Sequence, residues 1–236
     1  MIKNKKILIV GAGGFIGGHL VKKLLNDGNT IVASDIKPKE YWFQDLDEVE
    51  NHYAMDMKDI SNCRKVTKGV DYVFNMACNM GGMGFIENNK AECMQSVLIN
   101  TNLLIACKED KVKKYFFSSS ACAYNKTKQQ DVFIEGLKEE DAYPAEPEDG
   151  YGWEKLFSER MCRHFMEDYG IEVRIARYHN IYGPYGTYDG GREKAPAALC
   201  RKVIKAKKSN SNKIEVWGDG KQTRTFLYID DCVEGT

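Results

Sequence analysis

The sequence predicts an α/β protein built on a Rossmann-type, doubly wound parallel sheet, and three observations support this prediction. Short apolar runs rich in β-formers alternate with longer helical stretches up to about residue 178. A glycine-rich turn joins the first apolar run directly to the first helical stretch. The runs at 7–10 and 71–77 are almost continuously apolar, which is typical of parallel strands buried on both faces.

The expected elements follow one another in a regular order. The expected strands are 6–10, 30–35, 52–56, 71–77, 114–119 and 172–178. The expected helices are 14–27, 58–68, 87–108 and 151–168. In the first helix Ile16, Leu20 and Leu24 recur every four residues, and Gly28 stands where a helix stop belongs.

Two regions break the alternation. Residues 125–150 are polar and contain prolines, so we expect a long surface loop there. Beyond the sixth expected strand, glycines crowd together and a basic helical stretch follows from about Ala195 to Lys207. We therefore predict a dinucleotide-binding domain at 1–178, rejoined by about 224–236, and a small substrate-binding lobe at 179–223.

Composition excludes several classes of partner. Lys+Arg and Asp+Glu both count 34, so no basic excess points to nucleic acid or to an anionic membrane. There is no apolar run of the roughly 18 residues that a membrane helix needs, and the apolar run near the N-terminus is too short for a signal peptide. The eight cysteines form no CxxC pair and are expected to be mostly free thiols. We expect a cytoplasmic protein.

The turn after the first strand carries Gly11, Gly14 and Gly17. Glycine permits the backbone angles of a tight strand-to-helix turn and lets the main chain approach a pyrophosphate at the helix N-terminus. Asp35 ends the next strand, where a carboxylate can accept hydrogen bonds from the adenosine ribose and would repel a 2′-phosphate. The loop therefore predicts NAD rather than NADP.

Tyr151 and Lys155 lie four residues apart on one face of an expected helix. A free tyrosine titrates near pH 10, and a neighbouring ammonium together with the positive nicotinamide should lower that pKa. The pair could then move a proton while the cofactor performs redox chemistry. Ser120 follows the fifth expected strand and would hold the substrate oxygen.

Six further stretches are more specific than these general signals: Met80–Ile86, Ser119–Tyr124, Pro144–Pro147, Arg177–Pro184, Gly190–Ala197 and Trp217–Arg224. In these stretches and in the Gly-x-x-Gly-x-x-Gly loop, residues 7–236 resemble the GDP-mannose 3,5-epimerases of the extended short-chain dehydrogenase/reductase family. General sugar-nucleotide epimerases share the glycine loop, the Tyr–Lys pair and an Asn-x-Tyr-Gly-Pro block. They do not share the stretches beginning at Met80 and Gly190.

The resemblance implies a reaction. NAD oxidises the mannose C4 hydroxyl, with Tyr151 as base, and the resulting ketone acidifies the hydrogens at C3 and C5. Cys122 and Lys194 resemble the acid/base pair that inverts these two carbons. Reduction at C4 then gives GDP-L-galactose. A thiol exchanges protons readily, whereas lysine needs a desolvated or cationic setting to act as a base.

The resemblance also implies the site residues. The expected catalytic residues are Tyr151, Lys155, Cys122, Lys194 and Ser120, and no metal is expected. The expected cofactor contacts are Gly11, Gly14, Phe15, Ile16, Gly17, Asp35, Asp56, Met57, Ala77, Tyr151 and Lys155, with Asp56 ending the third strand. The expected substrate contacts are Gly81, Ser120, Cys122, Asn180, Glu193, Lys194, Ala195, Lys202, Gln222 and Arg224.

Two features bear on the assembly and on the completeness of the site. Extra apolar residues on helices 87–108 and 151–168 fit the four-helix dimer contact of extended family members, so a homodimer is expected. The chain stops where members of this family begin a helix, so we expect a C-terminally truncated substrate lobe, with NAD binding better preserved than substrate binding.

Two other functions remain open. A UDP-hexose 4-epimerase would need only Tyr151, Lys155, Ser120 and NAD, and the presence of Cys122 and Lys194 argues against it. A truncated NAD-binding protein without turnover is the second alternative. The intact Ser–Tyr–Lys set opposes that alternative, and the short C-terminus supports it.

Overall fold

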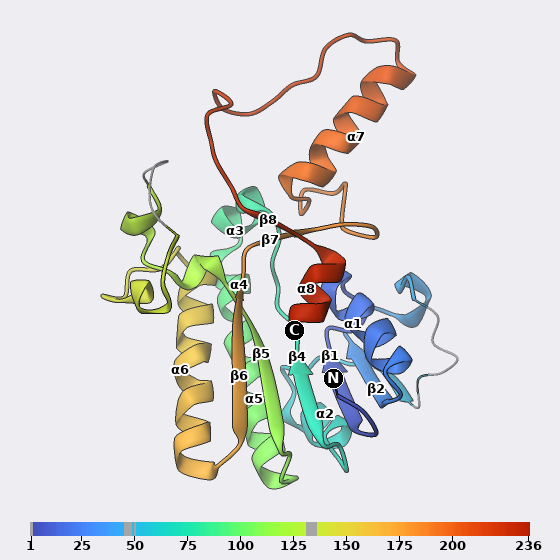
Figure 1. Cartoon of the computed structure of the whole chain (residues 1–236), viewed down its shortest axis with the longest axis vertical. Coiled ribbons are helices and arrows are strands. Elements are labelled where there is room, and N and C mark those ends of the chain that lie inside the picture. Colours follow the sequence, from blue (N-terminus) through green and yellow to red (C-terminus); the bar gives the residue numbers. More distant parts are fainter. Residues whose placement is uncertain (1, 45–48, 50, 131–135) are drawn as a thin grey trace.

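The protein is described by a computed structural model that covers residues 2–44, 49, 51–130 and 136–236. Its centre is a six-stranded parallel sheet, which confirms the predicted fold class (Figure 1). In spatial order the strands are β3 (Asn51–Ala54), β2 (Thr30–Asp35), β1 (Lys6–Val10), β4 (Tyr72–Asn75), β5 (Lys114–Ser120) and β6 (Glu172–Tyr178).

The strand order reverses between β1 and β4. The chain runs outward from β1 through β2 to β3, then returns to place β4 on the other side of β1 and continues outward to β6. The loops that follow β1 and β4 therefore leave the sheet in opposite directions and open a crevice at its carboxyl edge. In doubly wound sheets this switch point is where ligands bind.

Helices cover both faces of the sheet, which explains the continuously apolar β1. Ile7 and Ile9 pack on the face covered by α1 (Phe15–Asn26) and α8 (Ile229–Gly235). Leu8 and Val10 pack on the opposite face. That face is covered by α2 (Ile60–Val66), α5 (Ser96–Glu109) and α6 (Tyr151–Tyr169). None of the helices in the described part of the chain is long and apolar enough to cross a bilayer.

The prediction of a single helix at 87–108 is wrong. The chain instead forms α3 (Met83–Asn88), α4 (Lys90–Met94) and α5. At the first break Asn89 leaves the helical region (φ −132°, ψ 43°), and its side-chain amide donates to the carbonyl of Phe85. Asparagine competes with the helix for backbone hydrogen bonds, and the apolar periodicity did not reveal this competition.

The prediction of a long surface loop at 125–150 is wrong in part. Its described residues contain 3-10 turns at Lys126–Gln129 and Glu139–Ala142, and 131–135 lie outside the described residues. Ala142 is fully buried in a small cluster with Tyr124 and Leu156. The segment therefore helps to pack the start of α6.

The last part of the chain rises above the carboxyl edge of the sheet. Here β7 (Asn180–Tyr182) pairs in parallel with β8 (Phe226–Tyr228). Between them α7 (Ala195–Lys208) projects away from the sheet, and an extended segment at 209–225 leads back (Figure 1). Two more 3-10 turns occur at Lys39–Tyr41 and Ala121–Ala123.

Candidate functional site

The glycine turn after β1 is too crowded for side chains. Gly11 has φ +83°, and a Cβ atom there would lie 2.8 Å from the backbone nitrogen of Ala77. A Cβ at Gly17 would lie 2.1 Å from the carbonyl oxygen of Gly11. The turn is thus pressed against both α1 and the segment after β4. Such a turn leaves backbone N–H groups at the start of α1 to receive a pyrophosphate.

Asp35 lies at the end of β2, as expected. One carboxylate oxygen accepts from the backbone N–H of Gly13 at 2.9 Å, and the other accepts from the N–H of Lys37 at 2.8 Å. Each oxygen keeps a further lone pair, so the carboxylate can still accept from ribose hydroxyls. The contact with Gly13 also fixes the carboxylate beside the glycine turn.

A cavity of about 1250 Å³ runs along the carboxyl edge of the sheet. Every expected cofactor contact except Lys155 lines it. Asp56 lies two residues beyond the end of β3, which corrects its expected place as the last residue of that strand. The backbone N–H of Lys58 donates to the Asp56 carboxylate at 2.8 Å, so a turn holds this side chain.

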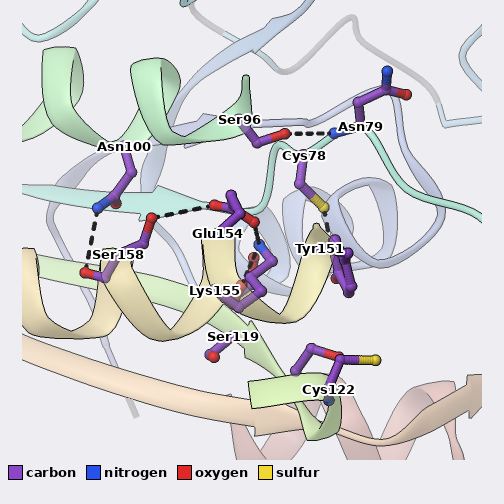
Figure 2. Close-up of polar contacts among 12 residues, drawn as sticks. Cys78, Asn79, Ser96, Asn100, Ser119, Cys122, Tyr151, Glu154, Lys155 and Ser158 are labelled. Carbon is purple, nitrogen blue, oxygen red and sulfur yellow. Dashed lines mark hydrogen bonds and ion pairs between the residues drawn. The ribbon is translucent and has the colours of Figure 1, made fainter. Parts of the chain in front are cut away.

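Tyr151 is the first residue of α6, and Lys155 lies one turn later beneath it. Both side chains are buried, and the Lys155 ammonium donates to the carbonyl of Ser118 at 2.9 Å. That ammonium is 5.5 Å from the centre of the Tyr151 ring. The Cys78 sulfur lies 4.0 Å from the tyrosine hydroxyl oxygen (Figure 2). The predicted pair is therefore assembled at the wall of the cavity.

Without a bound cofactor, burial raises the pKa of Tyr151 well above its ordinary value, with Cys78 and Cys122 contributing in the same direction. The predicted lowering of this pKa concerned the site with the positive nicotinamide present and stays a prediction, because in the chain by itself the desolvation of the phenolate favours the neutral phenol. Burial alone would lower the pKa of Lys155, yet Cys78 and Glu154 raise it overall.

Ser120 ends β5 at the cavity, and its hydroxyl accepts from the backbone N–H of Cys122 at 3.2 Å. Cys122 follows in the 3-10 turn and is half-buried. Burial raises its pKa, while the hydrogen bond to Ser120 lowers it. Ser120 lines the cavity, whereas Cys122 is not one of its lining residues and packs in the same small cluster as Tyr151.

Lys194 is the N-terminal cap residue of α7 and lines the cavity. Burial lowers its pKa, and the neighbouring Cys122 opposes that shift. The two groups come from parts of the chain that are remote in sequence, yet each acts on the other's pKa. Lys194 shares the cavity with Tyr151 and Ser120, and the joint role of Cys122 and Lys194 stays a prediction.

Two sequence motifs meet above the crevice. The backbone N–H of Gly82 donates to the carbonyl of Arg192 at 3.1 Å. A Cβ atom at Gly81 would lie 3.2 Å from the Cα atom of Arg192. Beside this contact Glu193 forms an ion pair with Arg201 at 2.6 Å. The stretches beginning at Met80 and Gly190 thus meet backbone against backbone, and this close approach explains the glycines at 81 and 82. Gly190 and Gly191 have open space around them and need glycine for their φ angles of +90° and +83°.

The remaining expected substrate contacts are more dispersed. The Asn180 side chain donates to the carbonyl of Thr225 at 3.1 Å, and Ala195 is exposed at the start of α7. Lys202 donates to the carbonyl of Glu215 at 2.8 Å and does not line the cavity. Gln222 and Arg224 are exposed in the extended segment, outside the cavity lining.

Sequence reasoning missed several residues that line the cavity, among them Cys78, His179, Arg192 and Arg201. Arg192 donates to the carbonyl of Met80 at 3.1 Å. Burial lowers the pKa of His179, and Lys194 acts in the same direction. Each missed residue lies next to, or inside, a stretch already singled out, and this adjacency is the signal that could have found it. In the described part of the chain no cluster of His, Cys, Asp or Glu is arranged to hold a metal.

The reversing parallel sheet, the crowded glycine turn and the Tyr–Lys pair at the crevice define a dinucleotide-binding protein of the Rossmann type. Comparison with family models narrows this class. The model of the NAD dependent epimerase/dehydratase family matches residues 7–236, and the chain belongs to that family. The glycine turn and Asp35 fit the cofactor that the family uses.

Curated relatives share about half of their matched residues with this chain. GDP-mannose 3,5-epimerase from Arabidopsis thaliana is 49% identical over 234 residues, which cover 99% of this chain and 61% of the relative. GDP-mannose 3,5-epimerase 1 from Oryza sativa subsp. japonica is 50% identical over 231 residues, which cover 98% of this chain and 60% of the relative. The chain thus spans about 60% of the length of these relatives.

Solved structures show the same architecture. UDP-glucuronic acid 4-epimerase from Bacillus cereus, in complex with UDP-glucuronic acid and NAD, superposes with a TM-score of 0.78 at 28% identity. The match covers 98% of this chain and 71% of that one.

Proposed function

We propose that this chain catalyses the NAD-dependent epimerisation of GDP-mannose at C3 and C5, giving GDP-L-galactose through a transient 4-keto sugar. The observation that carries the proposal is that Lys194 lines the same cavity as Tyr151 and Ser120, while Cys122 packs in the same cluster as Tyr151. A simple 4-epimerase has no use for this second potential acid/base pair. The two curated relatives of about 50% identity support the choice of substrate.

The Tyr–Lys pair serves the first and last steps. When bound, NAD supplies reversible two-electron oxidation at C4 of the sugar. Ser120 orients the C4 oxygen, and the Tyr151 oxygen takes the C4 hydroxyl proton and later returns it. Burial raises the pKa of Tyr151 in the chain alone, so the positive nicotinamide and the ammonium of Lys155 are needed to favour the phenolate.

The Cys–Lys pair serves the steps between. A ketone at C4 acidifies the hydrogens at C3 and C5, and inversion requires a base on one face of the ring and an acid on the other. Burial raises the pKa of Cys122, so the thiol keeps its proton until a stronger base, the deprotonated sugar carbon, needs it. Burial lowers the pKa of Lys194, so its neutral amine is accessible as a base.

The remaining roles follow the same division. The cofactor contacts belong to a dinucleotide-binding domain at 1–178, rejoined near 224–236, and the sugar nucleotide lies under a lobe at 179–223. Gly81, Asn180, Glu193 and Ala195 border the hexose, and Lys202, Gln222 and Arg224 hold the GDP phosphates. Charge-assisted hydrogen bonds make arginine and lysine suited to a pyrophosphate.

Isotope exchange tests the proposal. The chain is incubated with NAD and GDP-mannose in deuterated water, and deuterium is located on the sugar by NMR. We expect label at C3 and C5, and Cys122→Ala should abolish it while leaving NAD binding intact. Normal exchange in that variant would remove Cys122 from the mechanism. Inversion at C4 without label would favour a 4-epimerase, and no reaction at all would favour an NAD-binding protein without turnover.

We also infer a cytoplasmic homodimer. All eight cysteines are free, which suits a reducing compartment. Trp153 and Phe157 on α6 and Leu98 on α5 are exposed apolar side chains on adjacent helices. A second copy of the same two helices would cover them in a four-helix contact.

A further inference from the structure

Glu154, the residue immediately before Lys155, is buried to the same degree. Each side chain is only 1% exposed, and the carboxylate oxygen Oε2 lies 3.7 Å from the lysine Nζ (Figure 2). Adjacent helical residues do not normally face each other, and helical ion pairs usually join residues three or four apart on the surface. Two ionisable groups in succession inside the protein are costly to bury unless each serves the other.

Glu154 is held from one side only. The Ser158 hydroxyl donates to its Oε1 at 3.2 Å. The Asn100 side chain of α5 donates to the Ser158 carbonyl at 3.5 Å, which ties this turn of α6 to the neighbouring helix. Within the described chain Oε2 has no hydrogen-bond donor. The oxygen that faces the lysine is therefore the one without a hydrogen bond.

Lys155 has few other partners. Its ammonium donates to the Ser118 carbonyl and lies 4.7 Å from the centre of the Phe117 ring. In the described part of the chain its ion pair is with Glu154. The other titratable groups that act with it are Tyr151 and Cys162 on α6, Cys78 after β4 and Cys122 after β5. Burial raises the pKa of Tyr151, Cys122 and Cys162, so these three groups favour their neutral forms. Burial also raises the pKa of Glu154, but the ammonium of Lys155 and the Ser158 hydroxyl oppose that shift and favour the carboxylate.

We propose that Glu154 is a positioning residue whose buried carboxylate is the counter-charge that retains the ammonium of Lys155 beneath Tyr151. This inference rests on the proposed role of the Tyr–Lys pair and deepens it. Ser158 orients the carboxylate, and the carboxylate in turn holds the lysine where it can act on Tyr151 and on bound NAD. Glu154 itself does not line the cavity and touches neither substrate nor cofactor.

Removing the charge of Glu154 should change the titration of Lys155. In Glu154→Gln the amide keeps the size of the side chain and can still accept from Ser158. Burial lowers the pKa of Lys155, and the carboxylate no longer opposes it. The ammonium should then lose its proton at a pH lower by about 1–3 units, the usual effect of a close opposite charge. Glu154→Asp keeps the charge but withdraws it by one methylene, so it should shift the titration in the same direction by less.

The test is a pH titration of lysine side chains by ¹³C NMR on protein labelled at the lysine ε-carbon, without NAD or sugar nucleotide. The Lys155 resonance is assigned by its absence in Lys155→Arg. Glu167→Gln is the matched control, since Glu167 is an exposed carboxylate on the same helix, paired with Arg163. The control should leave the Lys155 titration unchanged.

An unchanged Lys155 titration in folded Glu154→Gln or Glu154→Asp would overturn the inference, as would an equal shift in the control. If Glu154→Gln fails to fold, the graded shift in Glu154→Asp decides. Because no cofactor or substrate is present, this outcome is independent of the isotope-exchange experiment. The proposed function can therefore fail while the positioning role of Glu154 stands. The positioning role can likewise fail while the proposed function stands.

Discussion

At the scale of single residues, the chemistry of this protein depends on what burial does to ordinary side chains. Burial raises the pKa of Cys122 and lowers the pKa of Lys194. Both shifts favour the uncharged form of the side chain. A thiol that keeps its proton and an amine that can give one up form a usable acid/base pair. An exposed thiol, with a pKa of about 8.5, also keeps its proton at neutral pH, but an exposed lysine, with a pKa of about 10.4, stays charged and is no base.

Lys194→Arg tests the lysine as a base. Arginine keeps the positive charge but does not lose its proton in proteins, so the variant can bind an anionic substrate but cannot accept a proton from carbon. We expect epimerisation to fall by about 10²–10⁴-fold, the usual size of a general acid/base contribution. NAD affinity should stay the same.

The measurement is deuterium incorporation under substrate saturation, with NAD affinity followed by fluorescence titration. Lys207→Arg is the control, since Lys207 is exposed on the same helix and does not line the cavity. Wild-type exchange in Lys194→Arg would show that this amine moves no proton.

At the scale of elements, the site depends on how α6 is tied to the strand that ends at Ser120. The Glu159 carboxylate accepts from the Ser119 hydroxyl at 2.5 Å. The Arg177 guanidinium of β6 donates to both oxygens of the same carboxylate, at 2.9 and 2.7 Å. Arg177 also donates to the carbonyl of Glu139 at 2.8 Å. One nearly buried ion pair thus joins α6, two strands and the loop that precedes the helix.

Glu159→Gln should therefore destabilise the fold. The substitution leaves Arg177 without its counter-charge while both side chains stay mostly buried, 15% and 10% exposed. We expect the free energy of unfolding to fall by about 3 kcal/mol, as for other broken buried pairs. Urea unfolding followed by circular dichroism measures the loss. Glu167→Gln, in an exposed pair on the same helix, should cost less than about 1 kcal/mol. Equal losses in the two variants would contradict the role given to the buried pair.

At the scale of the whole molecule, α5 and α6 carry exposed apolar side chains that a partner subunit would cover. Leu98 is 49% exposed, Trp153 44% and Phe157 50%. The two helices pack against each other (Figure 1), so we infer that these side chains belong to one apolar face. Apolar groups gathered in this way mark an interaction site more often than a free surface.

Phe157→Glu should turn the proposed dimer into a monomer, because a carboxylate in the proposed contact would be buried without a partner. Light scattering coupled to size exclusion at micromolar concentration gives the mass. Ile204→Glu on α7, an equally exposed apolar position far from this face, should leave the mass unchanged. A monomeric mass for the unmodified protein would refute the predicted assembly.

The sequence by itself determined the parallel sheet and the glycine turn, because buried parallel strands must be apolar on both faces and a crowded turn admits only glycine. It also determined the four-residue spacing of Tyr151 and Lys155, which is a local property of one helix. The break of the expected helix at Asn89 and the packing of Ala142 depended on hydrogen bonds and contacts that periodicity does not encode.

The tertiary structure alone decided how these pieces act on one another. Strand order places the ends of β4 and β5 beside the start of α6, and the fold of the last segment brings Lys194 to the cavity that Ser120 and Tyr151 also line. Burial raises the pKa of Tyr151 in the chain without NAD, and the fold places the carboxylate of Glu154 beside the ammonium of Lys155 inside the protein. Desolvation depends on what surrounds a group in space, and sequence spacing fixes only its neighbours along the chain.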